Sequence, residues 1–194
     1  MQETEKKSGK ELIRLARLSI ENFFEKSKEK EQEIKNISNK YKEKSGVFVT
    51  LKKNDELRGC IGFPYPSLPL GQAIVQAAQH AAFSDPRFMP LSEKEVSGIT
   101  IEISILTEPL EIKCKKKELA KKIKIGRDGL IVSYRNMTGL LLPQVAPEQG
   151  WNAQQFLEQT CVKAGLPAEI WKQEEYKFYK FQAEVFSEKI SKEE

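Results

Sequence analysis

Two pairs of short apolar runs constrain the fold more than any other feature of the sequence. Residues 47–51 and 57–63 are separated by five polar residues, and residues 130–134 and 139–143 are separated by four residues. β-branched and aromatic residues favour strands, and two such runs around a short turn are typical of a β-hairpin. The sequence therefore predicts two hairpins and strands that pair mainly in the antiparallel sense.

Helical patterns precede, separate and follow these hairpins. Apolar or small residues recur at helical spacing over residues 9–28, 69–83 and 152–164. Residues 98–106 alternate as a half-buried strand does, and residues 176–186 are expected to form one long final strand. Hairpins with intervening helices predict an α+β fold, in which a mostly antiparallel sheet is flanked by helices.

The length and the ends of the chain bound its organisation. A chain of 194 residues fits one large domain or two small lobes. We expect residues 1–194 to form a single domain, with frayed ends at residues 1–8 and 189–194. No apolar run approaches the roughly 18 residues that a membrane-spanning helix needs, and the charged first ten residues lack the apolar core of a secretory signal. These features predict a cytoplasmic protein that does not contact a membrane.

The cysteine and histidine content excludes several kinds of site. The three cysteines are far apart and form no Cys-x-x-Cys pair, which argues against a disulfide framework and against a zinc site of ordinary spacing. His80 is the one histidine of the sequence, so no site can be built from several imidazoles. Residues 126–129 resemble a phosphate-binding turn but lack the strand–loop–helix context that a nucleotide-binding loop requires. We therefore expect no metal and no cofactor.

The hexapeptide from Leu57 to Gly62 is the strongest candidate for a functional segment. Arg58 and Cys60 fall on one face of the predicted strand, where a cation beside a thiol would favour the nucleophilic thiolate. Cys60 and Arg58 are therefore candidate catalytic residues, with Gly59 and Gly62 forming the floor of a shallow site. The alternative is structural: a cysteine packed as a small apolar residue, and glycines that admit the following helix.

Further candidates for lining such a site follow later in the chain. Asp85 and Arg87 could supply an acid and a guanidinium, or could simply stop a helix and pair with each other. His80 could serve as a base, although a single helical histidine is more often only hydrogen-bonded. Gln144 follows the second hairpin and could also line a cleft.

One segment is strongly basic. From Lys113 to Arg127 the sequence holds eight basic residues and one acidic residue, within a chain of net charge +4. Such a segment could contact nucleic acid, but no aromatic residue is interleaved for stacking on bases. A solvated helix face is the preferred interpretation, so nucleic acid is not an expected partner.

Several ordered motifs resemble one protein family. The hexapeptide, preceded by Gly-Val-Phe-Val-Thr-Leu, is similar to the hallmark of the AMMECR family, also called AmmeMemoRadiSam system protein A. The resemblance covers roughly residues 10–187 and includes residues 85–88, 126–130, 142–146, 150–151 and 161–167.

The resemblance implies two unequal lobes with a cleft between them, and association with radical-SAM and Memo-type proteins. It implies no specific activity. Two main hypotheses therefore stay open, an enzyme or enzyme subunit acting through Cys60 and a non-catalytic interaction or ligand-binding module. Nucleic-acid binding through Lys113–Arg127 is kept as a third alternative.

Overall fold

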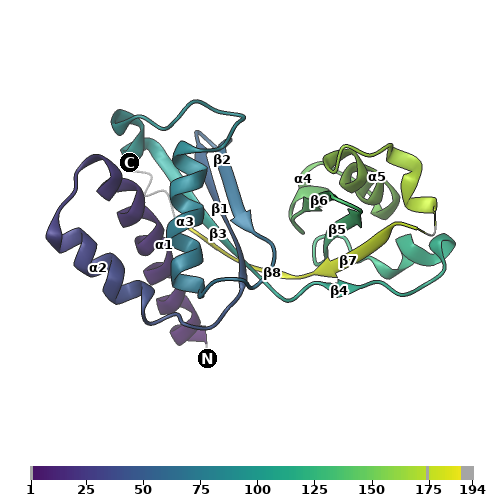
Figure 1. Ribbon diagram of the computed structural model, residues 1–194, viewed down its shortest axis with the longest axis horizontal. Coiled ribbons are helices and arrows are strands. Elements are labelled where there is room, and N and C mark those ends of the chain that lie inside the picture. The colour runs from purple at the N-terminus through teal and green to yellow at the C-terminus, as the bar shows by residue number, and fades with distance from the viewer. Residues whose placement is uncertain (1, 174, 189–194) are drawn as a thin grey trace. The chain divides into compact units, whose positions relative to one another are not determined.

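The computed structural model describes residues 2–173 and 175–188, and their side chains from Ser8 onward. The chain divides into two compact units, unit 1 with residues 1–105 and 184–194 and unit 2 with residues 106–183. Each unit has its own four-stranded sheet accompanied by helices (Figure 1). The predicted α+β class is confirmed, but the strands form two sheets where the sequence had indicated one.

The sheet of unit 1 contains the first predicted hairpin. Its strands, in spatial order, are β2 (Glu56–Phe63), β1 (Gly46–Lys53), β3 (Ile99–Leu106) and β8 (Ala183–Ser187). β1 and β2 pair in the antiparallel sense around Asn54 and Asp55, whose φ angles of 53° and 64° suit a tight hairpin turn. The register shifts between Leu51 and Lys52, so a bulge places Arg58 outside the regular ladder.

The helices of unit 1 are α1 (Gln2–Phe24), α2 (Lys28–Ser38), α3 (Leu70–Phe83) and the 3-10 helix η1 (Glu93–Gly98). Ser27 caps α2 by accepting a hydrogen bond from the backbone N–H of Lys30. α3 packs on β1 and β2, and α1 packs on α3, so these helices lie on one side of the sheet (Figure 1). The face of α3 that meets the sheet includes Ala77, Ala78 and Ala81, which are almost fully buried and permit a close approach.

Unit 2 contains the second predicted hairpin. Its strands, in spatial order, are β4 (Leu110–Glu111), β7 (Lys177–Phe181), β5 (Gly129–Tyr134) and β6 (Met137–Leu141), and all three pairings are antiparallel. Its helices are α4 (Val145–Glu148), α5 (Ala153–Lys163) and the 3-10 helices η2 (Lys116–Lys122) and η3 (Ala168–Lys172). Asn152 and Gln155 form the capping box of α5, and Gly165 follows its end with a φ of 74°.

The prediction of one long final strand was wrong. β7 belongs to the sheet of unit 2, whereas β8 belongs to the sheet of unit 1. Between them, the backbone N–H of Gln182 donates to Oγ1 of Thr107 and its carbonyl accepts from the N–H of Thr107, each at 2.9 Å. Side chains alternate with a period of two in any strand, whether one long strand or two short ones in succession. The alternating sequence from 176 to 186 therefore does not show that the chain passes from one sheet to the other at Gln182.

The predictions for the two ends of the chain and for membrane-spanning helices concern the remaining parts of the fold. Residues 189–194, predicted to be frayed, lie outside the described residues, and α1 already begins at Gln2. Among the described residues, no helix combines the length and the apolar character needed to cross a membrane.

Candidate functional site

The backbone of Cys60 lies at an exposed edge of the unit 1 sheet. β2 is an edge strand, and Cys60 is opposite Thr50 of β1. The N–H of Cys60 donates to Oδ2 of Asp85 at 2.9 Å, and its carbonyl accepts from Nη2 of Arg87 at 3.2 Å. The two side chains therefore occupy the positions at which another strand would pair with β2.

Asp85 and Arg87, hereafter the clamp, are held together by several hydrogen bonds. The backbone N–H and Nε of Arg87 donate to Oδ1 of Asp85 at 3.1 and 2.9 Å, and Nη2 donates to Oδ2 at 2.7 Å. The Asp85 side chain is only 2% exposed. The bonds from Arg87, helped by the N–H of Cys60, outweigh the effect of burial and lower the pKa of Asp85 from 3.8 to about 2. Asp85 therefore stays ionised, and the predicted pairing of Asp85 with Arg87 is confirmed.

The two glycines of the hexapeptide are required by close packing. A Cβ atom on Gly59 would lie 2.2 Å from the backbone oxygen of Ala81 on α3. A Cβ atom on Gly62 would lie 2.2 Å from the backbone oxygen of Val47 on β1. The structural interpretation therefore accounts for both glycines, whether or not they also border a ligand.

Arg58 has a partner that the sequence did not indicate. Its Nε and Nη2 lie 3.1 and 3.2 Å from the two carboxylate oxygens of Glu95, at the start of η1, and the Arg58 side chain is 15% exposed. The bonds from Arg58, followed by the N–H of Ser92, hold the pKa of Glu95 well below its usual range. Glu95 also forms a capping box with Ser92 at the start of η1, and that local role gives no sign of the ion pair.

Phe88 connects the two arginines. Its ring centroid lies 6.0 Å from Cζ of Arg58 and 5.4 Å from Cζ of Arg87, within the range of cation–π contacts. The neighbouring side chains Leu57 and Met89 are 44% and 81% exposed. Leu57 precedes Arg58 and Met89 follows Phe88 in the chain, and we call the five residues Leu57, Arg58, Arg87, Phe88 and Met89 the edge surface.

The thiol of Cys60 points to the sheet face opposite α3, because the adjacent Gly59 faces α3 and side chains alternate along a strand. Cys60 is partly exposed, and the Thr50 hydroxyl donates to its sulfur at 3.2 Å. Hydrogen bonds to Asp85 are the main cause that raises the pKa of Arg87, and the negative charge of a Cys60 thiolate contributes further. Arg87 is thus a cation with electrostatic coupling to Cys60, whereas Arg58 is paired with Glu95.

The two remaining predicted residues lie in or beside other elements of the fold. His80 is exposed on α3, with its ring centroid 6.5 Å from that of Phe63. Gln144 belongs to unit 2, where it precedes α4 and is partly buried. The structure therefore joins Cys60, Asp85 and Arg87 directly and adds Arg58 through Phe88. The cleft expected between two lobes stays a prediction.

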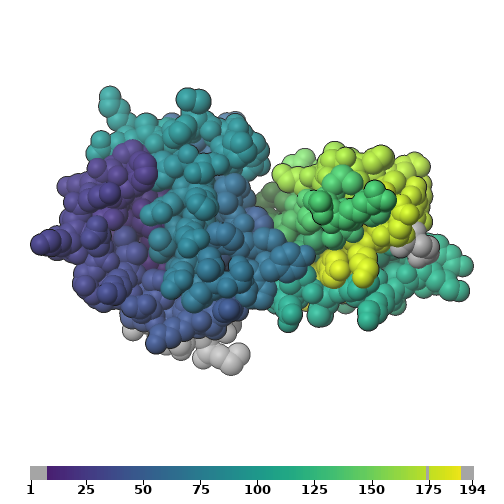
Figure 2. Space-filling view, in the orientation of Figure 1, coloured from purple at the N-terminus to yellow at the C-terminus, as the bar shows by residue number. Residues whose placement is uncertain are grey.

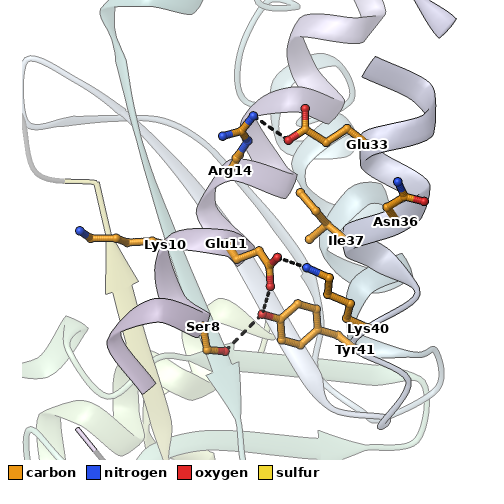
Figure 3. Close-up of a pocket in the computed structure, with 9 residues that line it drawn as sticks. All are labelled: Ser8, Lys10, Glu11, Arg14, Glu33, Asn36, Ile37, Lys40 and Tyr41. Atoms are coloured by element: carbon orange, nitrogen blue, oxygen red, sulfur yellow. Dashed lines mark hydrogen bonds and ion pairs between the residues drawn. The ribbon is translucent and has the colours of Figure 1, made fainter. Parts of the chain in front are cut away.

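A pocket of about 640 Å³ lies between α1 and α2 and contains none of the predicted site residues (Figure 3). Glu11 accepts from the Tyr41 hydroxyl at 2.8 Å and also pairs with Lys40, and Arg14 lies 2.6 Å from Glu33. These charged groups pair α1 with α2 and with the residues that follow α2, and ion pairs as exposed as these contribute little to stability.

Comparisons with known proteins agree on one family. The sequence model of AMMECR1 matches residues 13–186. Protein PF1979 of Pyrococcus furiosus is 50% identical over 185 residues, covering 93% of this chain and 88% of that protein. A protein of Aquifex aeolicus is 47% identical, covering 93% and 92% of the two chains. This chain belongs to the AMMECR1 family.

A solved structure supports the same assignment. The crystal structure of the uncharacterised protein PH0010 from Pyrococcus horikoshii matches with a TM-score of 0.87 and 43% sequence identity. The match covers 95% of this chain and 93% of that chain. The fold is therefore that of a known structure, and the names of these relatives state no activity.

Proposed function

We propose that this protein is a protein-interaction module whose binding site is the edge surface. The observation that carries the proposal is the fixed geometry of two arginines around Phe88. Asp85 holds Arg87, and Glu95 holds Arg58, each through two guanidinium nitrogens. Arginine, aromatic and methionine side chains are enriched in protein interfaces, and groups that are already ordered lose less entropy on binding.

The chemistry of the edge surface defines its partner. Met89 and Leu57 offer exposed apolar contact area, and the Arg87 side chain is 43% exposed. A protein partner with apolar side chains beside a carboxylate would complement this surface. The family resemblance suggests the radical-SAM and Memo-type proteins as the first partners to test.

A binding measurement with matched variants tests the proposal. Met89→Glu replaces a side chain that is 81% exposed, so it is expected to weaken partner binding at least thirtyfold, or about 2 kcal/mol, without unfolding unit 1. Val162→Glu makes the same kind of change at a 51% exposed position on α5 and serves as the control. Equal affinities for Met89→Glu and the unchanged protein would contradict the proposal.

A second candidate function is thiol chemistry at Cys60. It is favoured by the electrostatic coupling between Arg87 and the Cys60 thiolate, together with the Thr50 hydroxyl at 3.2 Å from the sulfur. A cation near a thiol favours the thiolate, which is the nucleophilic form. In this function Arg87 would have the activating role that the sequence suggested for Arg58.

The three cysteines provide an internal comparison for this candidate. Iodoacetamide at pH 7 should label Cys60 faster than the partly exposed Cys114 and faster than a model thiol. Cys161 should stay unlabelled in the folded protein, because burial raises its pKa to about 11. Labelling of Cys60 at or below the rate of the model thiol would exclude the activated nucleophile while leaving the interaction module intact.

A further inference from the structure

The net charge of the chain is confined to one unit. Unit 2 contains 13 basic and 9 acidic residues and therefore carries the entire net charge of +4, while unit 1 contains 19 of each. Within unit 2, the segment from Lys113 to Arg127, hereafter the basic strip, has eight basic residues and one acidic residue. The positive potential of the molecule is therefore concentrated on a short segment that includes η2.

The basic strip is fixed to the body of unit 2. Leu119 and Ile123 are buried in the apolar core of the unit. Lys116 Nζ donates to the backbone oxygen of Tyr176 and lies 5.3 Å from the ring centroid of Phe178. These contacts anchor the backbone of the segment to the core, so the exposed lysines extend from fixed backbone positions before any ligand binds.

Most of the lysines in the strip are available to a ligand. Within the described residues, six of them are exposed and have no carboxylate within 4.0 Å: Lys113, Lys115, Lys117, Lys121, Lys122 and Lys124. In unit 1, Lys40, Lys52 and Lys53 pair with glutamates, although other lysines of that unit are exposed as well. The strip, in the teal-to-green part of the colour scale, contributes to the surface of unit 2 (Figure 2).

We propose that the basic strip binds the phosphate backbone of double-stranded nucleic acid without sequence preference. Closely spaced lysines on an anchored segment match the closely spaced charges of a duplex, and the absence of aromatic residues excludes base stacking as the binding mode. Among the described residues of the strip, Ile125 is the one large apolar side chain that is exposed, at 37%, so the strip offers little to insert into a lipid surface. From the sequence alone, we interpreted this segment as a solvated helix face. That interpretation took account neither of the anchoring of the strip to the core of unit 2 nor of the concentration of the net charge in that unit.

The test uses the full chain and a fluorescein-labelled 20-base-pair DNA duplex of arbitrary sequence. Binding is measured by anisotropy between 50 and 200 mM NaCl. If the six lysines each neutralise one phosphate, the slope of log Kobs against log salt is about −5, and the affinity falls about a thousandfold over this range. The test variant carries Lys117→Glu, Lys121→Glu and Lys124→Glu, and it is expected to roughly halve the slope and to bind at least tenfold more weakly at 50 mM salt.

A control with the same change in charge excludes a general effect of net charge. It carries Lys26→Glu, Lys28→Glu and Lys35→Glu, at exposed positions of unit 1 that form no ion pair with any described side chain, and should bind like the unchanged protein. Absence of duplex binding at 50 mM salt, or equal binding by the test variant, would overturn the proposal. Binding to phosphatidylserine vesicles without binding to the duplex would overturn it in favour of a lipid surface. Because the strip and the edge surface are in different units, Met89→Glu should leave duplex binding unchanged.

Discussion

Replacing Asp85 by asparagine removes the negative charge of the clamp while keeping the shape of the side chain. The pKa of Asp85 lies at about 2 in the folded protein and 3.8 is its ordinary value, a difference equivalent to about 2 kcal/mol. Because the folded-state pKa is the lower of the two, this stabilisation is fully present above pH 4 and is lost as the pH falls through about 2. Asp85→Asn should therefore lower the free energy of unfolding at pH 7 by about 2 kcal/mol.

Urea denaturation at pH 7 and at pH 2.5 separates this electrostatic effect from a packing defect. Both tryptophans, Trp151 and Trp171, lie in unit 2, so fluorescence reports on unit 2. Far-UV circular dichroism reports on both units, and a transition seen there but not in fluorescence belongs to unit 1. The difference between Asp85→Asn and the unchanged protein should shrink at pH 2.5, because the carboxyl of the unfolded chain is then almost fully protonated and that of the native protein is partly protonated. A difference of equal size at both pH values, or one below about 0.5 kcal/mol at pH 7, would refute the role assigned to the clamp.

Two further substitutions test the packing and the charges. Gly59→Ala should lower the free energy of unfolding by about 3 kcal/mol, because its Cβ would collide with backbone, whereas Gly98→Ala has open space and should change it by less than about 0.5 kcal/mol; circular dichroism measures both. Burial opposes ionisation of Asp128, but hydrogen bonds from Arg127 and the N–H of Lys124 outweigh it and lower the pKa of Asp128. Asp128→Asn should therefore destabilise unit 2 more at pH 7 than at pH 3, as followed by tryptophan fluorescence; an effect independent of pH would contradict this.

Local signals in the sequence predicted most elements of the fold. The polar turn at Asn54 and Asp55 and the capping residue Asn152 act within a few positions of themselves, so the hairpin and the helix could be recognised without tertiary information. The exchange of the chain between two sheets at Gln182 could not, because it depends on a partner at Thr107. The register shift that frees Arg58 from the ladder likewise depends on how β2 packs against β1 and α3.

The sequence predicted which residues belong to the candidate site better than it predicted the contacts between them. Cys60 and Asp85 were both singled out, but the bond between them joins residues 25 positions apart and involves backbone of Cys60, which carries no side-chain signal. The pairing of Arg58 with Glu95 spans 37 positions and was missed, because nothing close to either residue in the sequence points to the other. The family resemblance singled out the segments that contain Cys60 and Asp85 as parts of one motif set. It did not predict the hydrogen bonds that join them.

Binding of purified radical-SAM and Memo-type proteins from the source organism, measured by calorimetry, decides whether the edge surface is an interaction site. One of the two should bind the unchanged protein and the Val162→Glu control with equal affinity, and Met89→Glu at least thirtyfold more weakly. Circular dichroism must show the same unfolding transition for all three proteins. Absence of binding by both partners, or binding that Met89→Glu leaves unchanged, would contradict the proposed interaction module.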